Sequence, residues 1–138
     1  MSNSQKVERK LSVIMFTDIA DFTKLSSHDE SAALNLLNTQ RNTLQPIIKE
    51  HDGKCLKEIG DGLLLTFNSA TKAVNCAIKI QELTRNIENL NLRIGIHQGE
   101  VIEQEGDVIG DDVNVASRIE PFSAVGGIAI SNKIHADI

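Results

Sequence analysis

The sequence lacks the features that mark secreted or membrane-bound proteins. Its 138 residues include only 2 cysteines and 2 prolines, with no tryptophan and no tyrosine. Two cysteines cannot build a disulfide framework, so we expect free thiols in a reducing compartment. No run approaches the ~18–20 apolar residues of a membrane-spanning helix, and residues 1–10 lack the apolar stretch of a secretory signal. These absences predict a soluble, cytoplasmic chain.

An excess of positive charge is also missing. The formal net charge is -5, from 14 basic and 19 acidic side chains. A protein that coats nucleic acid needs a basic footprint, so the composition argues against a nucleic-acid partner. The chain is 41% hydrophobic and 24% charged, which is typical of one globular domain. We expect that domain at residues 11–138, after a flexible lead-in at residues 1–10.

The apolar pattern predicts the elements of a mixed domain. Strands are expected at residues 11–16, 54–59, 62–67, 92–97, 100–104 and 128–130. Helices are expected at residues 28–52, 69–88 and 113–120, with turns at 18–23 and 98–99 and a last helical turn after Ser131. The order βαββαβ predicts an α+β, ferredoxin-like fold, an antiparallel sheet with helices on one face.

Two aspartates stand where strands end. Asp18 follows the first strand, and Asp61 lies in the Gly60-Asp61-Gly62 turn of a hairpin. Because the helical crossovers place the first strand beside that hairpin, we expect both carboxylates at one edge of the sheet. Mg²⁺ prefers such hard oxygen ligands and keeps positions for water and phosphates. The alternative is that Asp18 caps a turn and Asp61 is an ordinary hairpin residue.

Four ordered motifs carry a family resemblance. They are Phe16-Thr-Asp-Ile-Ala-Asp-Phe-Thr23, Lys57-x-x-Gly-Asp61, Arg93-Ile-Gly-Ile-His-Gln-Gly99 and Asp107-x-x-Gly-x-x-Val-Asn-Val-Ala-Ser-Arg118. With these motifs the chain resembles the class III nucleotidyl cyclases, the catalytic domains of adenylyl and guanylyl cyclases. The resemblance covers residues 11–138. Because the family domain continues with further strands, the C-terminal part is expected to be incomplete.

The resemblance implies a site for two divalent cations, Mg²⁺ or Mn²⁺. Asp18 and Asp61 would bind them, with the backbone carbonyl of Ile19 as a further ligand. One ion would help to activate the ribose 3′-hydroxyl, and the other would hold the triphosphate. Asp21 stands where the family usually has glycine, which would bring an extra carboxylate near the phosphates.

The resemblance also implies a pair of residues that reads the base. Lys57 would donate a hydrogen bond to adenine N1, and Asp107 would accept one from the exocyclic amine. Guanine-reading relatives typically carry glutamate and cysteine or a similar pair there, so this pair favours ATP over GTP. Seen alone, Lys57 could equally be a solvated lysine on an edge strand.

Further residues would bind the ribose and the phosphates. The resemblance implies that Asn114 orients the ribose and that Arg118 stabilises charge on the α-phosphate. Arg93 and the backbone at Phe22 and Thr23, entering the first helix, would bind the phosphates. Taken singly, Asn114 could cap a helix, Arg118 could pair with a neighbouring acid, and Arg93 could be a surface residue.

In this family, opposite subunits supply the metal aspartates and the base-reading residues of one site. The resemblance therefore implies a head-to-tail C2 homodimer that acts as an adenylyl cyclase in intracellular signalling, with any regulatory domain elsewhere in the parent protein. The alternative is a catalytically silent nucleotide-binding or dimerisation module of the same fold. A diguanylate cyclase is disfavoured, because residues 60–64 do not resemble a Gly-Gly-Asp-Glu-Phe hairpin.

Overall fold

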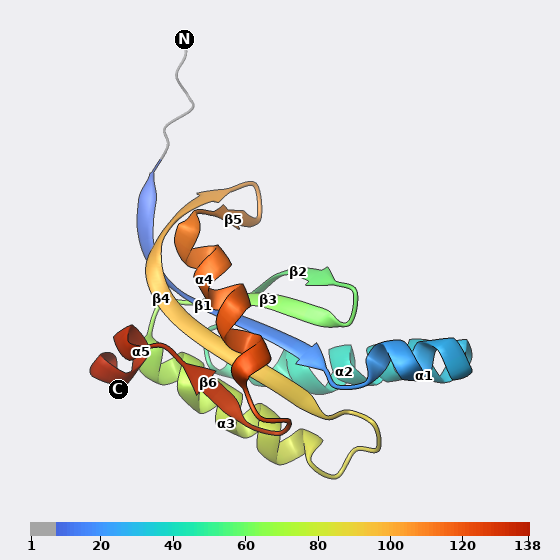
Figure 1. Ribbon diagram of the computed structural model, residues 1–138. Coiled ribbons are helices and arrows are strands. Elements are labelled where there is room, and N and C mark those ends of the chain that lie inside the picture. The colour runs from blue at the N-terminus through green and yellow to red at the C-terminus, as the bar shows by residue number, and fades with distance from the viewer. Residues whose placement is uncertain (1–7) are drawn as a thin grey trace.

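The computed structural model describes residues 8–138 (Figure 1). Its strands are β1 Arg9–Ile19, β2 Lys54–Ile59, β3 Gly62–Phe67, β4 Leu92–Gln104, β5 Asp107–Ile109 and β6 Ile128–Ile130. Its helices are α1 Phe22–His28, α2 Glu30–Glu50, α3 Ala70–Thr84, α4 Asp111–Ile119 and α5 Asn132–Asp137, with a 3-10 turn at Glu120–Phe122. None of these helices is long and apolar enough to cross a membrane. The flexible lead-in predicted for residues 1–10 lies largely outside the described residues, and its last two belong to β1.

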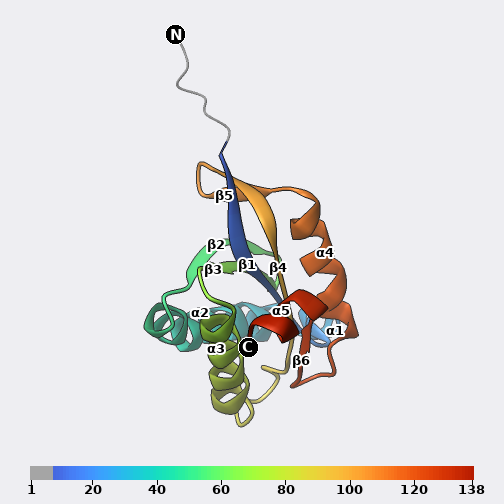
Figure 2. The ribbon, with the colours of Figure 1, turned by 90° about the vertical axis from the view of Figure 1, so that its left-hand side faces the viewer.

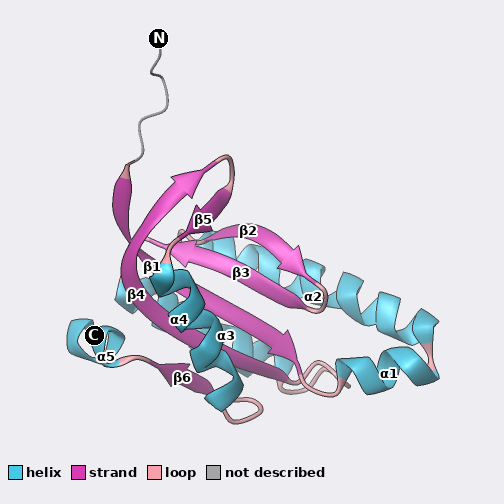
Figure 3. Ribbon diagram, turned by 45° about the horizontal axis from the view of Figure 1, so that its top comes forward, coloured by secondary structure: helices cyan, strands magenta, loops and turns pink. Residues whose placement is uncertain are grey.

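The strands confirm the predicted ferredoxin-like order. Within the described residues they form a six-stranded sheet in the order β2-β3-β1-β4-β5, with β6 parallel to β4. The first four strands and the helices between them give the βαββαβ arrangement, in which β1 pairs antiparallel with both β3 and β4. This arrangement places the end of β1 beside the tip of the β2–β3 hairpin, as Figure 3 shows.

Helices cover both faces of the sheet, which corrects the prediction of helices on one face. The larger core lies between the sheet and α2 and α3, around side chains such as Met15, Leu65 and Ile94. A smaller cluster on the opposite face includes Ile14, Leu64 and Ala116, the last from α4. Figure 2 shows α2 and α3 on one side of the sheet and α4 on the other. The prediction missed this layer because the short α4 follows the four-strand unit on which it was based.

Three boundaries also differ from the prediction. The residues expected to turn at 18–23 continue β1 to Ile19 and then begin α1 at Phe22. Asp29 separates α1 from α2, where its side chain accepts a hydrogen bond from the Ala32 N–H. The turn expected at 98–99 is absent from β4, which runs unbroken through both residues. Gly99 serves close packing there, because a Cβ would overlap the Asp112 side chain.

Candidate active site

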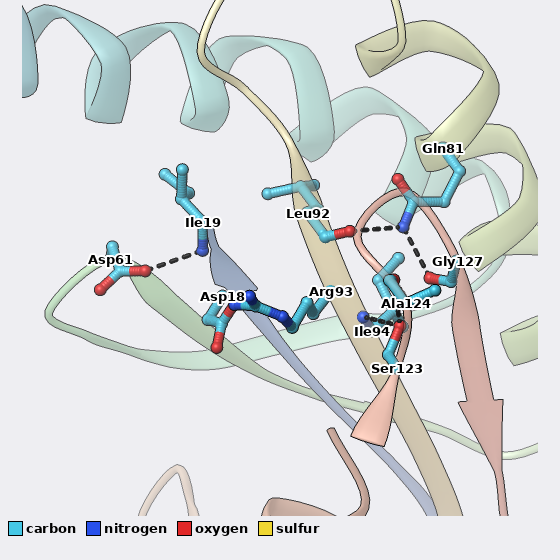
Figure 4. A network of polar contacts seen from close by, with 10 residues as sticks. All are labelled: Asp18, Ile19, Asp61, Gln81, Leu92, Arg93, Ile94, Ser123, Ala124 and Gly127. Carbon is cyan, nitrogen blue, oxygen red and sulfur yellow. Dashed lines mark hydrogen bonds and ion pairs between the residues drawn. The ribbon is translucent and has the colours of Figure 1, made fainter. Parts of the chain in front are cut away.

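The sheet brings Asp18 and Asp61 together. Thr17 pairs with Leu63, so the next residue of β1, Asp18, lies beside Gly62 at the hairpin tip. The approach requires glycine, because a Cβ at Gly62 would lie 2.6 Å from the Thr17 carbonyl oxygen. The backbone N–H of Ile19 donates to Asp61 Oδ2 at 2.7 Å (Figure 4). The predicted meeting of the two aspartates at one sheet edge is therefore seen in the structure.

Arg93 completes this end of the sheet. It lies opposite Asp18 on β4, and its guanidinium is 3.3 Å from Asp18 Oδ1. A cavity of about 540 Å³ opens over these residues. Its lining comes from the ends of β1 and β4, the hairpin tip and the start of α1, and comprises Asp18, Ile19, Asp21, Phe22, Thr23, Lys24, Ser27, Asp61 and Arg93. Seven of the residues singled out in the sequence thus share one cavity.

The donor set of this cavity fits hard divalent cations that retain other ligands. Asp18 and Asp61 offer carboxylate oxygens, which Mg²⁺ and Mn²⁺ prefer. Among residues 8–138 no three His, Cys, Asp or Glu side chains converge tightly enough to hold a metal ion alone. Mg²⁺ commonly binds through one or two carboxylates and completes its octahedron with water and substrate phosphates. Asp18 and Asp61 therefore fit a magnesium site in which two carboxylates share the ion with water and substrate phosphates.

Asp21 occupies a conformation that favours glycine. Its φ is 61°, in the left-handed region, and it precedes α1 without a hydrogen bond from its side chain to the helix. Asp and Asn tolerate this region better than other non-glycine residues. Its carboxylate adds negative charge to a cavity that already holds Asp18 and Asp61.

Glu120 is a residue of this site that the sequence did not reveal. It follows α4 in the 3-10 turn and is only 8% exposed, and its Oε2 has no hydrogen-bond partner within the described part of the chain. Burial, and after it the neighbouring carboxylates of Asp18 and Asp61, raise the pKa of Glu120 to about 8, whereas Arg93 opposes them. The approach of Glu120 to β4 depends on Gly95, where a Cβ would lie 2.5 Å from the Glu120 Cα.

This buried acid predicts a pH-dependent loss of stability. The folded chain keeps the proton up to about pH 8, whereas the unfolded chain releases it near 4.5, so stability falls as the pH rises between these values. Glu120→Gln should remove that fall and be more stable than the parent at pH 8.5 by a few kcal/mol, since one pKa unit is worth about 1.4 kcal/mol. Urea unfolding in EDTA at several pH values measures this difference.

The exposed Glu82 on α3 provides the control for this experiment. Glu82→Gln removes the same charge from a solvated position and should leave the pH dependence of the free energy of unfolding unchanged. If Glu120→Gln and the parent gave parallel curves from pH 4 to 9, the buried, protonated state of Glu120 would be contradicted.

Lys57 and Asp107, to which the resemblance assigns the reading of the base, form a second group. Lys57 Nζ lies 3.1 Å from Asp107 Oδ2, between β2 and β5, and neither residue lines the cavity over Asp18. The Val108 N–H, and secondly Lys57, hold the pKa of Asp107 below its usual value. Lys57 pairs in the sheet with Leu64, whose side chain lies in the cluster under α4. The pair therefore belongs to the α4 side of the sheet.

Asn114 and Arg118 form the third group. Both are exposed on α4, four residues apart and so on one face of the helix. Neither lines the cavity over Asp18 and Asp61. The single chain thus presents the predicted residues as three separate sets, at the end of the sheet, across β2 and β5, and on α4.

A partly buried His–Asp pair fixes the start of α4. His97 Nε2 lies 2.8 Å from Asp112 Oδ1, and Asp112 Oδ2 accepts a hydrogen bond from the Glu100 N–H. The hydrogen bond with His97 lowers the pKa of Asp112. His97 is buried in the middle of β4. The pair ties α4, and with it Asn114 and Arg118, to the sheet.

Comparisons with known proteins agree with this geometry. The family model described as "Adenylate and Guanylate cyclase catalytic domain" matches residues 5–137. The "Putative adenylate cyclase 3" of Rhizobium meliloti is 34% identical over 95% of this chain, which covers 24% of that protein. The chain therefore spans about a quarter of the length of this curated relative, and 17% of another, a serine/threonine-protein kinase of Myxococcus xanthus.

Solved structures of similar proteins share the whole fold. An adenylate/guanylate cyclase/hydrolase from Silicibacter pomeroyi is 34% identical with a TM-score of 0.85, and the match covers 95% of this chain and 81% of that one. A dimeric guanylyl cyclase domain from the fungus Blastocladiella emersonii, described as non-canonical, is 28% identical with a TM-score of 0.88. That match covers 95% of this chain and 85% of the fungal one.

Proposed function

The chain belongs to the adenylate and guanylate cyclase catalytic domain family, and we propose that it converts ATP to 3′,5′-cyclic AMP and pyrophosphate. The relatives include both adenylate and guanylate cyclases, so the choice of base must come from residues of this chain. The observation that carries the proposal is the 3.1 Å pair of Lys57 and Asp107. An ammonium donor beside a carboxylate acceptor matches adenine, which accepts at N1 and donates from its amine.

The metal site would lie at the end of the sheet. Asp18 and Asp61, with the Ile19 carbonyl, would hold two Mg²⁺ or Mn²⁺ ions, whose positive charge favours ionisation of the ribose 3′-hydroxyl and neutralises the triphosphate. The 3′-hydroxyl would give up its proton to solvent and its oxygen would attack the α-phosphorus, while the bond from that phosphorus to the bridging oxygen breaks and pyrophosphate leaves. Arg93 and the backbone at Phe22 and Thr23 would bind its phosphates.

Asn114 and Arg118 would act on the same nucleotide from α4. The Asn114 amide would orient the ribose, and Arg118 would stabilise the negative charge that builds on the α-phosphate as the ring closes. Charge fixed in advance of the reaction needs no reorganisation, which makes such a group effective in phosphoryl transfer. Both side chains are exposed and are free to meet a ligand bound against another surface.

A second copy of the chain would bring the three sets together. Asn114, Arg118, Lys57 and Asp107 do not line the cavity of Asp18 and Asp61. We therefore propose a head-to-tail C2 homodimer, in which one copy supplies the metal ligands and the other supplies the base-reading pair and α4. The similar guanylyl cyclase domain of Blastocladiella emersonii forms a dimer, which supports the pairing of two copies.

The nucleotide assignment is tested by changing Lys57. The purified chain is incubated with ATP or GTP and Mg²⁺ or Mn²⁺, and cyclic product is quantified by chromatography. Lys57→Glu should lower kcat/KM for ATP by about 10- to 100-fold, because a donor to adenine N1 is replaced by a like-charged acceptor beside Asp107. Guanine carries a proton at N1, so the ratio of GTP to ATP turnover should rise.

Lys54 supplies the matched control for this variant. It is another exposed lysine of β2 and forms an ion pair with Glu103 at 3.7 Å. Lys54→Glu makes the same change of charge away from the Lys57–Asp107 pair, and it should keep the parent's preference for ATP over GTP. If the parent used GTP better than ATP, the adenylyl assignment would be wrong.

One observation favours a second candidate, a catalytically silent nucleotide-binding or dimerisation module. Asp21 adds a carboxylate to the cavity that would receive the phosphates, and its repulsion would weaken triphosphate binding. Such a module would bind nucleotide or dimerise, but in the turnover assay it would release no cyclic product with either cation.

A further inference from the structure

Gln40 places an amide in the apolar core directly behind the Asp61 turn. It lies in the middle of α2 and is 2% exposed. The other side chains that α2 buries are apolar, namely Ala33, Leu36, Leu44, Ile47 and Ile48. An amide moved from water to such surroundings costs free energy unless it is hydrogen-bonded. Packing alone would favour an apolar side chain at this position, so the hydrogen bonds of the amide must explain why a glutamine stands there.

The amide of Gln40 makes one hydrogen bond, and its partner is Asp61. Gln40 Nε2 donates to the Asp61 carbonyl oxygen at 3.2 Å. Its Oε1 is buried, and within residues 8–138 it has no hydrogen-bond partner. Turning the amide over would set two oxygens against each other, so the Asp61 carbonyl fixes its orientation. Gln40 therefore connects α2 to the backbone of this turn, while its Oε1 stays unpaired within the described residues.

Asp61 is consequently fixed at two points. Its carboxylate accepts from the Ile19 N–H at 2.7 Å, and its carbonyl accepts from Gln40. The rest of the turn lies at the surface, since no atom lies within 4 Å of the position of a Cβ at Gly60 and the side chains of the edge strand β2 are mostly exposed. Helix α2 also contacts the hairpin through Arg41, whose guanidinium binds the Glu58 carboxylate at 2.7 Å, but that ion pair lies three residues before Asp61. The bond from Gln40 is the contact of α2 that reaches the Asp61 backbone itself.

We propose that Gln40 is a positioning residue, which sets the place of the Asp61 carboxylate relative to Asp18 by holding the backbone of the hairpin tip. The inference rests on the proposed function, which assigns these two carboxylates to divalent cations. Residues that orient metal ligands typically change metal affinity or activity by about 10- to 100-fold when they are replaced. Gln40 touches neither substrate nor cation and acts through Asp61 alone.

The test is Gln40→Met, which keeps the length of the side chain and a good helix former but removes the hydrogen bond. Mn²⁺ binding to the nucleotide-free chain is measured by electron paramagnetic resonance, and thermal unfolding is followed in EDTA. We expect Mn²⁺ to bind about 10-fold more weakly while Tm is kept or raised. In the turnover assay, the Mn²⁺ concentration for half-maximal rate should rise, and excess Mn²⁺ should restore part of kcat.

Gln81 offers a matched control on α3. It is also a buried glutamine, and its Nε2 donates to the carbonyls of Leu92 and Gly127 (Figure 4). Gln81→Met should lower Tm and leave Mn²⁺ affinity at the parent's value. Asp61→Ala should lose Mn²⁺ affinity fully, and the smaller loss expected for Gln40→Met is compared with that loss.

The outcomes separate this inference from the function on which it rests. If Asp61→Ala loses Mn²⁺ and Gln40→Met binds it as tightly as the parent, the role of Gln40 is overturned while the metal site stands. If Gln40→Met and Gln81→Met weaken Mn²⁺ equally, the effect is general loosening and the role is again overturned. If the parent and Asp61→Ala bind Mn²⁺ alike, both the metal assignment and this inference fail.

Discussion

Asp61→Ala is expected to lower the turnover of ATP by about 1,000-fold or more while the chain still folds. Metal ions supply several kcal/mol of charge stabilisation in the transition state, and each ~1.4 kcal/mol is a factor of ten in rate. The variant removes a carboxylate at the mouth of the cavity and one hydrogen bond, from the Ile19 N–H. Circular dichroism and thermal unfolding check the fold, and cyclic AMP formation measures the loss.

A glutamate on the same hairpin provides the control for this variant. Glu58 is an exposed residue of β2 whose carboxylate lies 2.7 Å from the Arg41 guanidinium. Glu58→Ala removes a carboxylate three residues away from Asp61 without touching the cavity, and it should keep most of the turnover. Equal rates for the parent and Asp61→Ala, with both chains folded, would remove Asp61 from the reaction.

The ferredoxin-like core could be predicted because its pattern is local. Continuous apolar runs marked β1 and β3, and the Gly60-Asp61-Gly62 turn marked the hairpin between β2 and β3. Once the order βαββαβ is recognised, the neighbours of β1 follow, and they bring Asp18 beside Asp61. The same reasoning failed at residues 98–99, because the sequence alone does not distinguish a glycine in a turn from a glycine under a neighbouring side chain.

The residues around the aspartates could not be predicted, because their roles depend on contacts between distant segments. Gln40 lies 21 positions from Asp61 in the sequence, and its bond exists only when α2 packs behind the hairpin. Glu120 precedes Pro121, so the sequence suggested only the end of a helix. Its burial against Asp18 requires the path of the chain from α4 back over β4, including the space that Gly95 leaves.

The arrangement of one active site across two copies predicts that two inactive variants restore each other. Asp61→Ala damages only the metal set, and Arg118→Ala damages only the set on α4. In a mixed dimer one site then carries both defects, and the other combines an intact Asp61 with an intact Arg118. Random exchange of equal amounts makes half of the dimers mixed, so about a quarter of the parent activity should return.

The ratio of the two chains decides the interpretation of this experiment. Activity should follow the product of the two fractions and reach its maximum at equal amounts, because it depends on mixed dimers. The same preparations mixed under conditions that prevent subunit exchange should stay inactive, and a double variant carrying both changes should add nothing. If Asp61 and Arg118 of one chain served the same site, no mixture would recover activity, since every site would carry one of the two defects. Because Arg118 is exposed on α4 and does not line the cavity of Asp61, we expect the recovery.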